Sequence, residues 1–100
     1  MLKQKVLKVK AGMLEEWKAW CSELQNERHE EAKATLEEEG LEYETAGLFR
    51  LDDNYYVIAT VYGEAKASDK SKEINRTHLE KRRKCLEPVS DVEVLYLLQS

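Results

Sequence analysis

Hydrophobic residues recur along this chain with two different periods, and each period predicts one kind of element. Leu14, Trp17, Cys21 and Leu24 step by three and four residues, the spacing of one buried helical face. Elsewhere, valine, leucine and tyrosine alternate with polar residues or form short β-prone runs, as half-buried strands do. The pattern predicts strands over 4–10, 41–51, 55–63 and 91–98, and helices over 13–39 and from a cap at Ser68, Asp69 or Ser71 to about Leu86.

These elements follow the order βαββαβ, which is the split βαβ arrangement of the ferredoxin-like fold. We therefore expect one α+β domain over residues 1–100, with a four-stranded antiparallel sheet and two helices on one face. Asp52, Asp53 and Asn54 supply the turn between the two central strands. Gly40 is expected to end the first helix, and Pro88 the second.

Both faces of the predicted sheet carry apolar groups, although helices cover only one of them. On the strand over 55–63, Tyr55 and Val57 share one face, whereas Tyr56, Ile58 and Tyr62 share the other. A monomer seldom leaves so large an apolar surface in water, so the pattern predicts a homodimer of the dimeric α+β barrel type, in which two sheets pack face to face. A monomer with one tyrosine-rich exposed face remains the alternative.

Charged residues interrupt the helical faces that the hydrophobic pattern predicts to be buried. Arg28 continues the stripe of Trp17, and the second helix places His78 and Arg82 between its apolar residues. An unpaired charge in a core is costly, so these groups must be paired or must line a wet cavity. The sequence therefore predicts a polar pocket between the helices and the sheet.

Four residues are the candidates for lining this pocket. Arg28 would hold an anionic group, although it can also pair with Glu31 one helical turn away. His78 would donate a hydrogen bond or a proton, and Trp17 would supply apolar contact. A small-molecule binding protein for an anionic ligand is the first hypothesis. The alternatives are a cofactor-independent enzyme, monooxygenase-like or isomerase-like, with His78 as catalytic residue, and a non-catalytic homodimeric interaction module.

Composition and net charge indicate which classes of binding partner are not expected. The chain has 100 residues, of which 42% are hydrophobic and 36% charged, with a formal net charge of -4, so neither nucleic acid nor a membrane is expected as a partner. Cys21 and Cys85 have no CxxC spacing, and His29, with Lys33 four residues later, lacks the second histidine of HExxH. We expect no metal and no cofactor. Buried thiols and the lack of a signal peptide favour a cytoplasmic location.

Several short motifs resemble a family of uncharacterised conserved proteins of about this length. They are Lys8-Val9-Lys10 followed by Leu14-Glu15-Glu16-Trp17, Arg28 with Leu36, and the segment from Thr77-His78 to Cys85-Leu86-Glu87-Pro88. The resemblance implies a ferredoxin-like fold of the dimeric α+β barrel type and no assigned activity. The wider superfamily includes small monooxygenases, heme-degrading enzymes and amino-acid-sensing regulators, and a shared fold does not choose among these functions.

Overall fold

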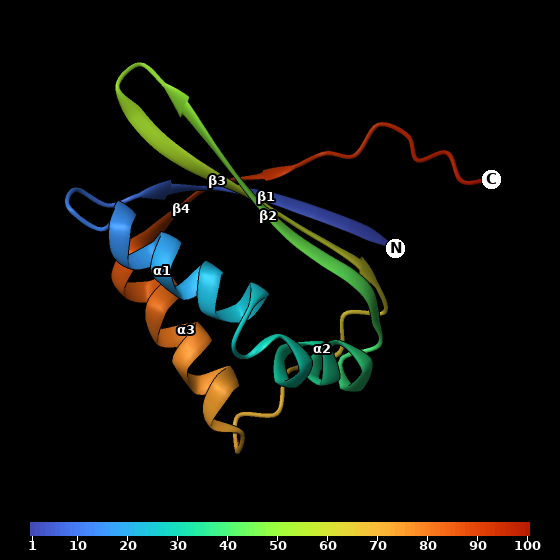
Figure 1. Cartoon of the computed structure of the whole chain (residues 1–100). Coiled ribbons are helices and arrows are strands. Elements are labelled where there is room, and N and C mark those ends of the chain that lie inside the picture. The colour runs from blue at the N-terminus through green and yellow to red at the C-terminus, as the bar shows by residue number, and fades with distance from the viewer.

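A computed structural model describes residues 1–100 and confirms the α+β fold, with a four-stranded sheet on one side and all of the helices on the other (Figure 1). The chain runs β1 (Leu2–Val9), α1 (Leu14–Gln25), α2 (His29–Glu38), β2 (Leu41–Leu51), β3 (Asn54–Gly63), α3 (Glu73–Cys85) and β4 (Leu86–Val92). None of these helices is both long and apolar enough to cross a membrane.

The strands pair in the order β2-β3-β1-β4, and every pair is antiparallel, as the ferredoxin-like topology requires. The turn between β2 and β3 falls where the sequence predicts it. Asp52 and Asp53 adopt φ values of 50° and 65°, the left-handed conformation that a tight two-residue hairpin needs. The two edges of the sheet are β2 and β4.

The first predicted helix is wrong in one respect, because the chain breaks it into α1 and α2. Asn26 ends α1: its backbone N–H and its side-chain Nδ2 both donate to the carbonyl oxygen of Ser22, each at 2.9 Å. An asparagine side chain that binds nearby backbone competes with continued helix. The turn directs α2 toward the start of β2, where Thr35 becomes buried, whereas a straight helix of this length would have left the body. Gly40 follows α2 with a φ of 69°, as expected.

The second predicted helix and the last predicted strand are shifted. Lys72 precedes α3 without a side-chain cap, so none of the predicted serine or aspartate caps is used. Leu86 directly begins β4, and Pro88 lies within this edge strand opposite Leu7, where the pairing register shifts. β4 ends at Val92, opposite Gln4, so only Asp91 and Val92 of the predicted strand over 91–98 pair with another strand.

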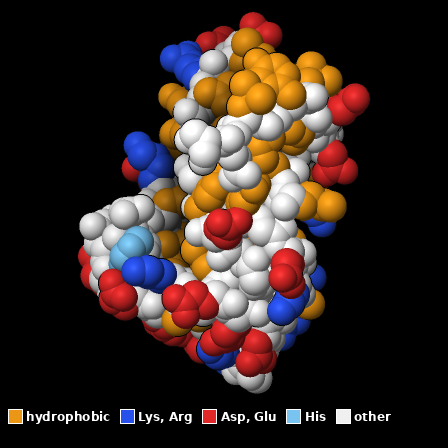
Figure 2. Space-filling model, turned by 90° about the vertical axis from the view of Figure 1, so that its right-hand side faces the viewer, with side chains coloured by type: hydrophobic (Ala, Val, Ile, Leu, Met, Phe, Trp, Pro, Cys, Tyr) orange, Lys and Arg blue, Asp and Glu red, His pale blue; other side chains and the backbone are white.

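The two faces of the sheet have different surroundings. Contacts with the helices fix Val57 and Ala59 on the covered face, so alternation places Tyr56 and Ile58 on the open face, as the sequence predicts. Figure 2 shows hydrophobic side chains gathered over the sheet on one flank of the molecule, while charged side chains crowd the helical half. The fold therefore leaves an apolar sheet face that no element of this chain covers.

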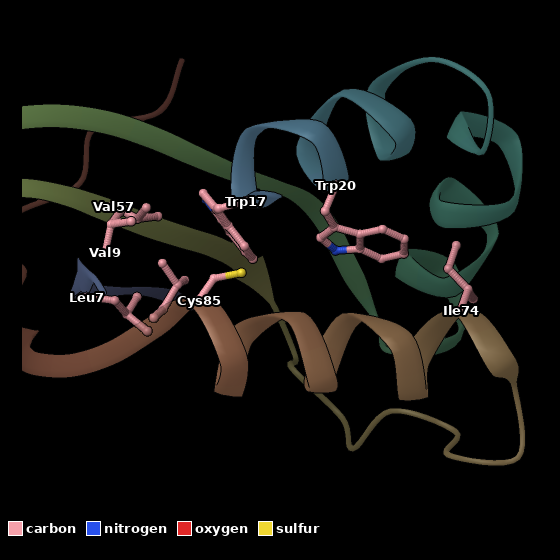
Figure 3. Packing of buried hydrophobic residues seen from close by; sticks show 8 residues of the cluster. Leu7, Val9, Trp17, Trp20, Val57, Ile74 and Cys85 are labelled. Carbon is pink, nitrogen blue, oxygen red and sulfur yellow. The ribbon is translucent and has the colours of Figure 1, made fainter. Parts of the chain in front are cut away.

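The hydrophobic core lies between the covered face and the helices α1 and α3. Trp17 of α1 and Cys85 of α3 face each other above β1 and β3, and Trp20 lies one turn further along α1 (Figure 3). Their exposed fractions are 5%, 0% and 3%. The core is small, and the two tryptophans supply much of its volume.

We predict that Gly63→Ala destabilises the fold strongly. Gly63 has a φ of 140°, and a Cβ atom there would lie 2.3 Å from the carbonyl oxygen of Gly40. Because neither backbone segment can move freely, we expect a loss of about 2–4 kcal/mol in the free energy of unfolding, measured by urea denaturation. Gly12→Ala is the control, since its φ is 77° but nothing lies within 4 Å, and about 1 kcal/mol is expected. Equal losses in the two variants would contradict the steric argument.

Candidate binding pocket

A pocket of about 230 Å³ opens between the helices and the covered face of the sheet. Its floor is small and apolar, because alanine and valine stand where β2 and β3 pass beneath the helices. Trp17 of α1 closes one side, and α3 closes the other. The lining residues are Lys3, Lys5, Leu7, Trp17, Glu44, Ala46, Val57, Ala59, Val61, His78, Arg82 and Leu86.

His78 lines this pocket in a defined protonation state. The indole Nε1–H of Trp20 donates to Nδ1 of His78 at 2.9 Å, and both Trp17 and Trp20 lie within about 6 Å of the imidazole, ring centre to ring centre. Because Nδ1 accepts, the neutral ring carries its proton on Nε2. Desolvation, followed by the charge of Arg82, lowers the pKa of His78 to about 4, so the ring is neutral at pH 7. His78 therefore offers an N–H donor.

The Nε2–H group is free to bind a ligand. No hydrogen bond within the chain engages it, and no fully buried side-chain polar atom of this protein lacks a partner. Nε2 of His78 therefore retains access to solvent, and the residue lies on the pocket wall. A hydrogen-bond donor with a fixed tautomer is the arrangement that positions a carbonyl, hydroxyl or carboxylate oxygen.

Positive charge dominates the mouth of the pocket. Lys3 and Lys5 project from β1 and Arg82 from α3, and none of the three forms an ion pair with a carboxylate within 4.0 Å. Glu44 is the one acidic residue among those that line the pocket. Much of the Glu44 residue is exposed, yet the partial burial of its carboxyl raises the pKa of that group. The positive charge of Arg82 acts in the opposite direction and lowers it. The cations thus outnumber the acid.

Arg28 lies outside this pocket and is already satisfied. It sits at the break between α1 and α2, and its guanidinium contacts Glu31 at 3.0 Å, Glu73 at 2.6 Å and Glu23 at 3.8 Å. The hydrogen bonds to Glu31, and next those to Glu73, raise the pKa of Arg28. The guanidinium also lies 5.7 Å from the ring centre of Trp20. Arg28 is therefore linked to His78 through Trp20.

The structure thus brings together two of the four predicted site residues. Trp17 and His78 line the pocket, whereas Arg28 and Glu31 pair with each other next to it, as their three-residue spacing allows. Arg82 lies one turn after His78, on the face that the sequence marks as polar, but the prediction did not include it in the site. The lysines of the pocket were also missed, although they alternate along β1 on the same face as Leu7 and Val9. Glu44 gave no usable signal, because the register of β2 decides its face.

Comparison with known proteins gives one match. A model of a protein family described as "Family of unknown function (DUF6176)" matches residues 4–100. No curated protein and no solved structure matches the chain significantly. The match therefore places nearly the whole chain in one family and brings no activity with it.

We predict that His78 makes this fold sensitive to acid well above the range in which carboxylates titrate. The folded state resists protonation of His78, whose pKa is lowered from 6.5 to about 4, while the unfolded chain accepts the proton normally. Stability from this group is present in full above pH 6.5 and is lost as the pH falls toward 4, with a magnitude of about 3 kcal/mol. Urea denaturation across this pH range measures the effect.

His78→Gln is the matched variant, since an amide oxygen can still accept from Trp20 but does not titrate. We expect its free energy of unfolding to change less between pH 6.5 and 4 than that of the unmodified chain. Parallel pH profiles for the two proteins would show that His78 is not protonated on unfolding.

Proposed function

Since the chain belongs to the family of unknown function DUF6176, we propose its function from the pocket itself: the protein binds a small organic anion between α1, α3 and the sheet. The volume, about 230 Å³, lies below the range of pockets for drug-sized ligands. It suits a compact molecule with one acidic group and an apolar body. This volume is too small to enclose a nucleotide.

One observation carries this proposal, namely the contrast between the two arginines near the pocket. Arg28 shares its guanidinium among three carboxylates, whereas Arg82 has no ion-pair partner and lies half-buried against the pocket. A half-buried guanidinium without a carboxylate partner is ready for a planar anion, because its fork of N–H donors matches a carboxylate or a phosphate. Lys3 and Lys5 add positive charge at the same mouth.

The proposed contacts divide the ligand into an acidic end and an apolar end. Arg82 would hold the acid, while the Nε2–H of His78 would donate to a second oxygen atom. Trp17 and the apolar floor would contact the body of the molecule. We assign Arg28 and Glu31 a supporting role. Glu31 binds the guanidinium of Arg28, which lies over the ring of Trp20, and Trp20 orients His78 through its hydrogen bond.

The same geometry makes binding a better proposal than acid–base catalysis. A general acid or base works best when its pKa lies near the working pH. The low pKa of His78, about 4, leaves the imidazole neutral at pH 7 and makes it a poor proton acceptor. A neutral, oriented imidazole is well suited to donating a hydrogen bond, and this is the role that we propose for His78.

We predict that Arg82→Gln weakens binding of a carboxylate probe such as benzoate about tenfold or more, because a charge-assisted bidentate contact is lost. Arg83→Gln is the control: it changes the net charge equally, but Arg83 is exposed and absent from the pocket lining. Titrations followed by NMR, read at the indole N–H signals and the His78 ring protons, measure both affinities. Equal affinities for the two variants, or no saturable shifts in the unmodified protein, would contradict the proposal.

We also propose that the chain forms a homodimer through the open face of its sheet. On β1, β2 and β3 the central open-face positions are Leu2, Gln4, Val6, Lys8, Tyr43, Thr45, Gly47, Phe49, Tyr56, Ile58, Thr60 and Tyr62, and Lys8 alone is charged. The whole chain is 36% charged, so charge is depleted from this surface. Tyr43 stacks on Tyr62 and Phe49 on Tyr56, leaving two flat aromatic pairs for a second sheet to contact.

We predict that the unmodified chain sediments as a dimer at micromolar concentration and that Ile58→Lys sediments as a monomer. Ile58 lies in the middle of the open face, and a lysine there would place an unpaired charge in the interface. Ala34→Lys on the exposed side of α2 is the control and should remain dimeric. A monomeric unmodified chain would contradict the homodimer. So would an Ile58→Lys variant that stays dimeric with an unchanged circular dichroism spectrum.

A further inference from the structure

The last eight residues, 93–100, leave the sheet with their apolar side chains uncovered. Leu95, Tyr96 and Leu98 expose 85%, 78% and 84% of their surface. Figure 1 shows this segment running from the end of β4 past the N-terminus and away from the helices. We call residues 93–100 the C-terminal arm. Such exposure in a β-prone segment indicates a missing partner.

The pairing register explains why the arm finds no partner in its own chain. β4 pairs with β1 up to Val92, which lies opposite Gln4. Continuing this register would bring Glu93 opposite Lys3 and Val94 opposite Leu2, but neither pair forms. The arm therefore has the alternation of a strand but no neighbouring strand to complete its hydrogen bonds.

The sheet has two edges, and only one of them is suited to accept another strand. β4 carries Pro88, which has no N–H, and a register shift beside it, and both features protect an edge. β2 is eleven residues long, contains no proline, and is exposed along all of its length except Leu41. β2 is thus the edge that is open to strand addition.

A groove runs along this free edge. About 400 Å³ of space lies between α1 and β2, lined by Ala46, Gly47 and Leu48 on the strand and by Cys21 and Ser22 on the helix. A strand added to β2 would point alternate side chains into this groove and the others toward the open face. In the arm, Leu95 and Leu97 alternate with Tyr96 and Leu98, so both directions would receive apolar groups.

We infer that the C-terminal arm of one chain adds as a strand to the free edge of β2 in a second copy of this chain. Each copy has one uncovered arm and one free edge, so a two-fold dimer satisfies both without a third component. Tyr62 Oη on the open face donates to Gln99 Oε1 at 2.7 Å, which makes the arm and the open face one continuous surface. The inference rests on the homodimer proposed above and identifies the segment that is exchanged.

Truncation of the chain after Val92 tests the arm. We expect the truncated chain to keep its circular dichroism spectrum, since the arm forms no helix or strand, and to dimerise at least about 100-fold more weakly in sedimentation equilibrium. Glu93→Gln is the control and should dimerise like the unmodified chain. If truncation leaves dimerisation unchanged while Ile58→Lys abolishes it, the homodimer stands and the exchanged arm is overturned. A monomeric unmodified chain overturns both.

Cross-linking tests the edge. In a Cys21→Ala background, with Cys85 fully buried, a Leu97→Cys chain is mixed with tagged chains carrying Ala46→Cys, Leu48→Cys or Arg50→Cys. These positions share one side of β2, so we expect a disulfide between tagged and untagged chains in at least one mixture. Val89→Cys on the exposed side of β4 is the control partner and should not cross-link. Cross-linking to Val89→Cys alone, or to no position, would overturn the assignment to β2.

Discussion

The hydrogen bond from the indole of Trp20 to His78 is the interaction on which the candidate site depends. It joins α1 to α3 across the top of the core and satisfies a polar group that would otherwise be costly to bury. It also decides the tautomer of the imidazole, and therefore that Nε2 carries the proton of the neutral ring. A core this small contains few alternatives, because the two tryptophans on α1 occupy most of the space between the helices.

Some cationic side chains of the helices are paired with carboxylates and others are not. The paired ones stabilise the fold, whereas an unpaired one can bind a ligand. At the junction of α1, α2 and α3, Arg28 lies among three carboxylates, which explains how the chain tolerates a helix break beside its core. Glu16 of α1 similarly binds two lysines of α3, and the contact with Lys84, followed by that with Lys81, lowers the pKa of Glu16. Arg82 lines the pocket and has no carboxylate within 4.0 Å of its guanidinium. This contrast is the basis of the binding role proposed above for Arg82.

The sheet imposes a second constraint, because it is apolar on both faces but has helices on only one. Ferredoxin-like connectivity places every helix on the same side, so no helix of the chain covers the open face. The backbone of the C-terminal arm lacks a neighbouring strand, just as the side chains of the open face lack a covering layer. The second copy proposed above would cover both.

The amino-acid sequence by itself determined the order of elements, the hairpin at Asp52 and Asp53, the split of Tyr56 and Val57 between faces, and the pairing of Arg28 with Glu31. These features depend on contacts within a few residues or on the simple periods of helix and strand. Only the tertiary structure decided the break at Asn26, the early end of β4, and the meeting of Arg82 with Lys3 and Lys5. Each of these depends on segments far apart in the chain: α2 turns to reach β2, the pairing of β4 with β1 ends at Val92 opposite Gln4, and the pocket brings residues of β1 and α3 together.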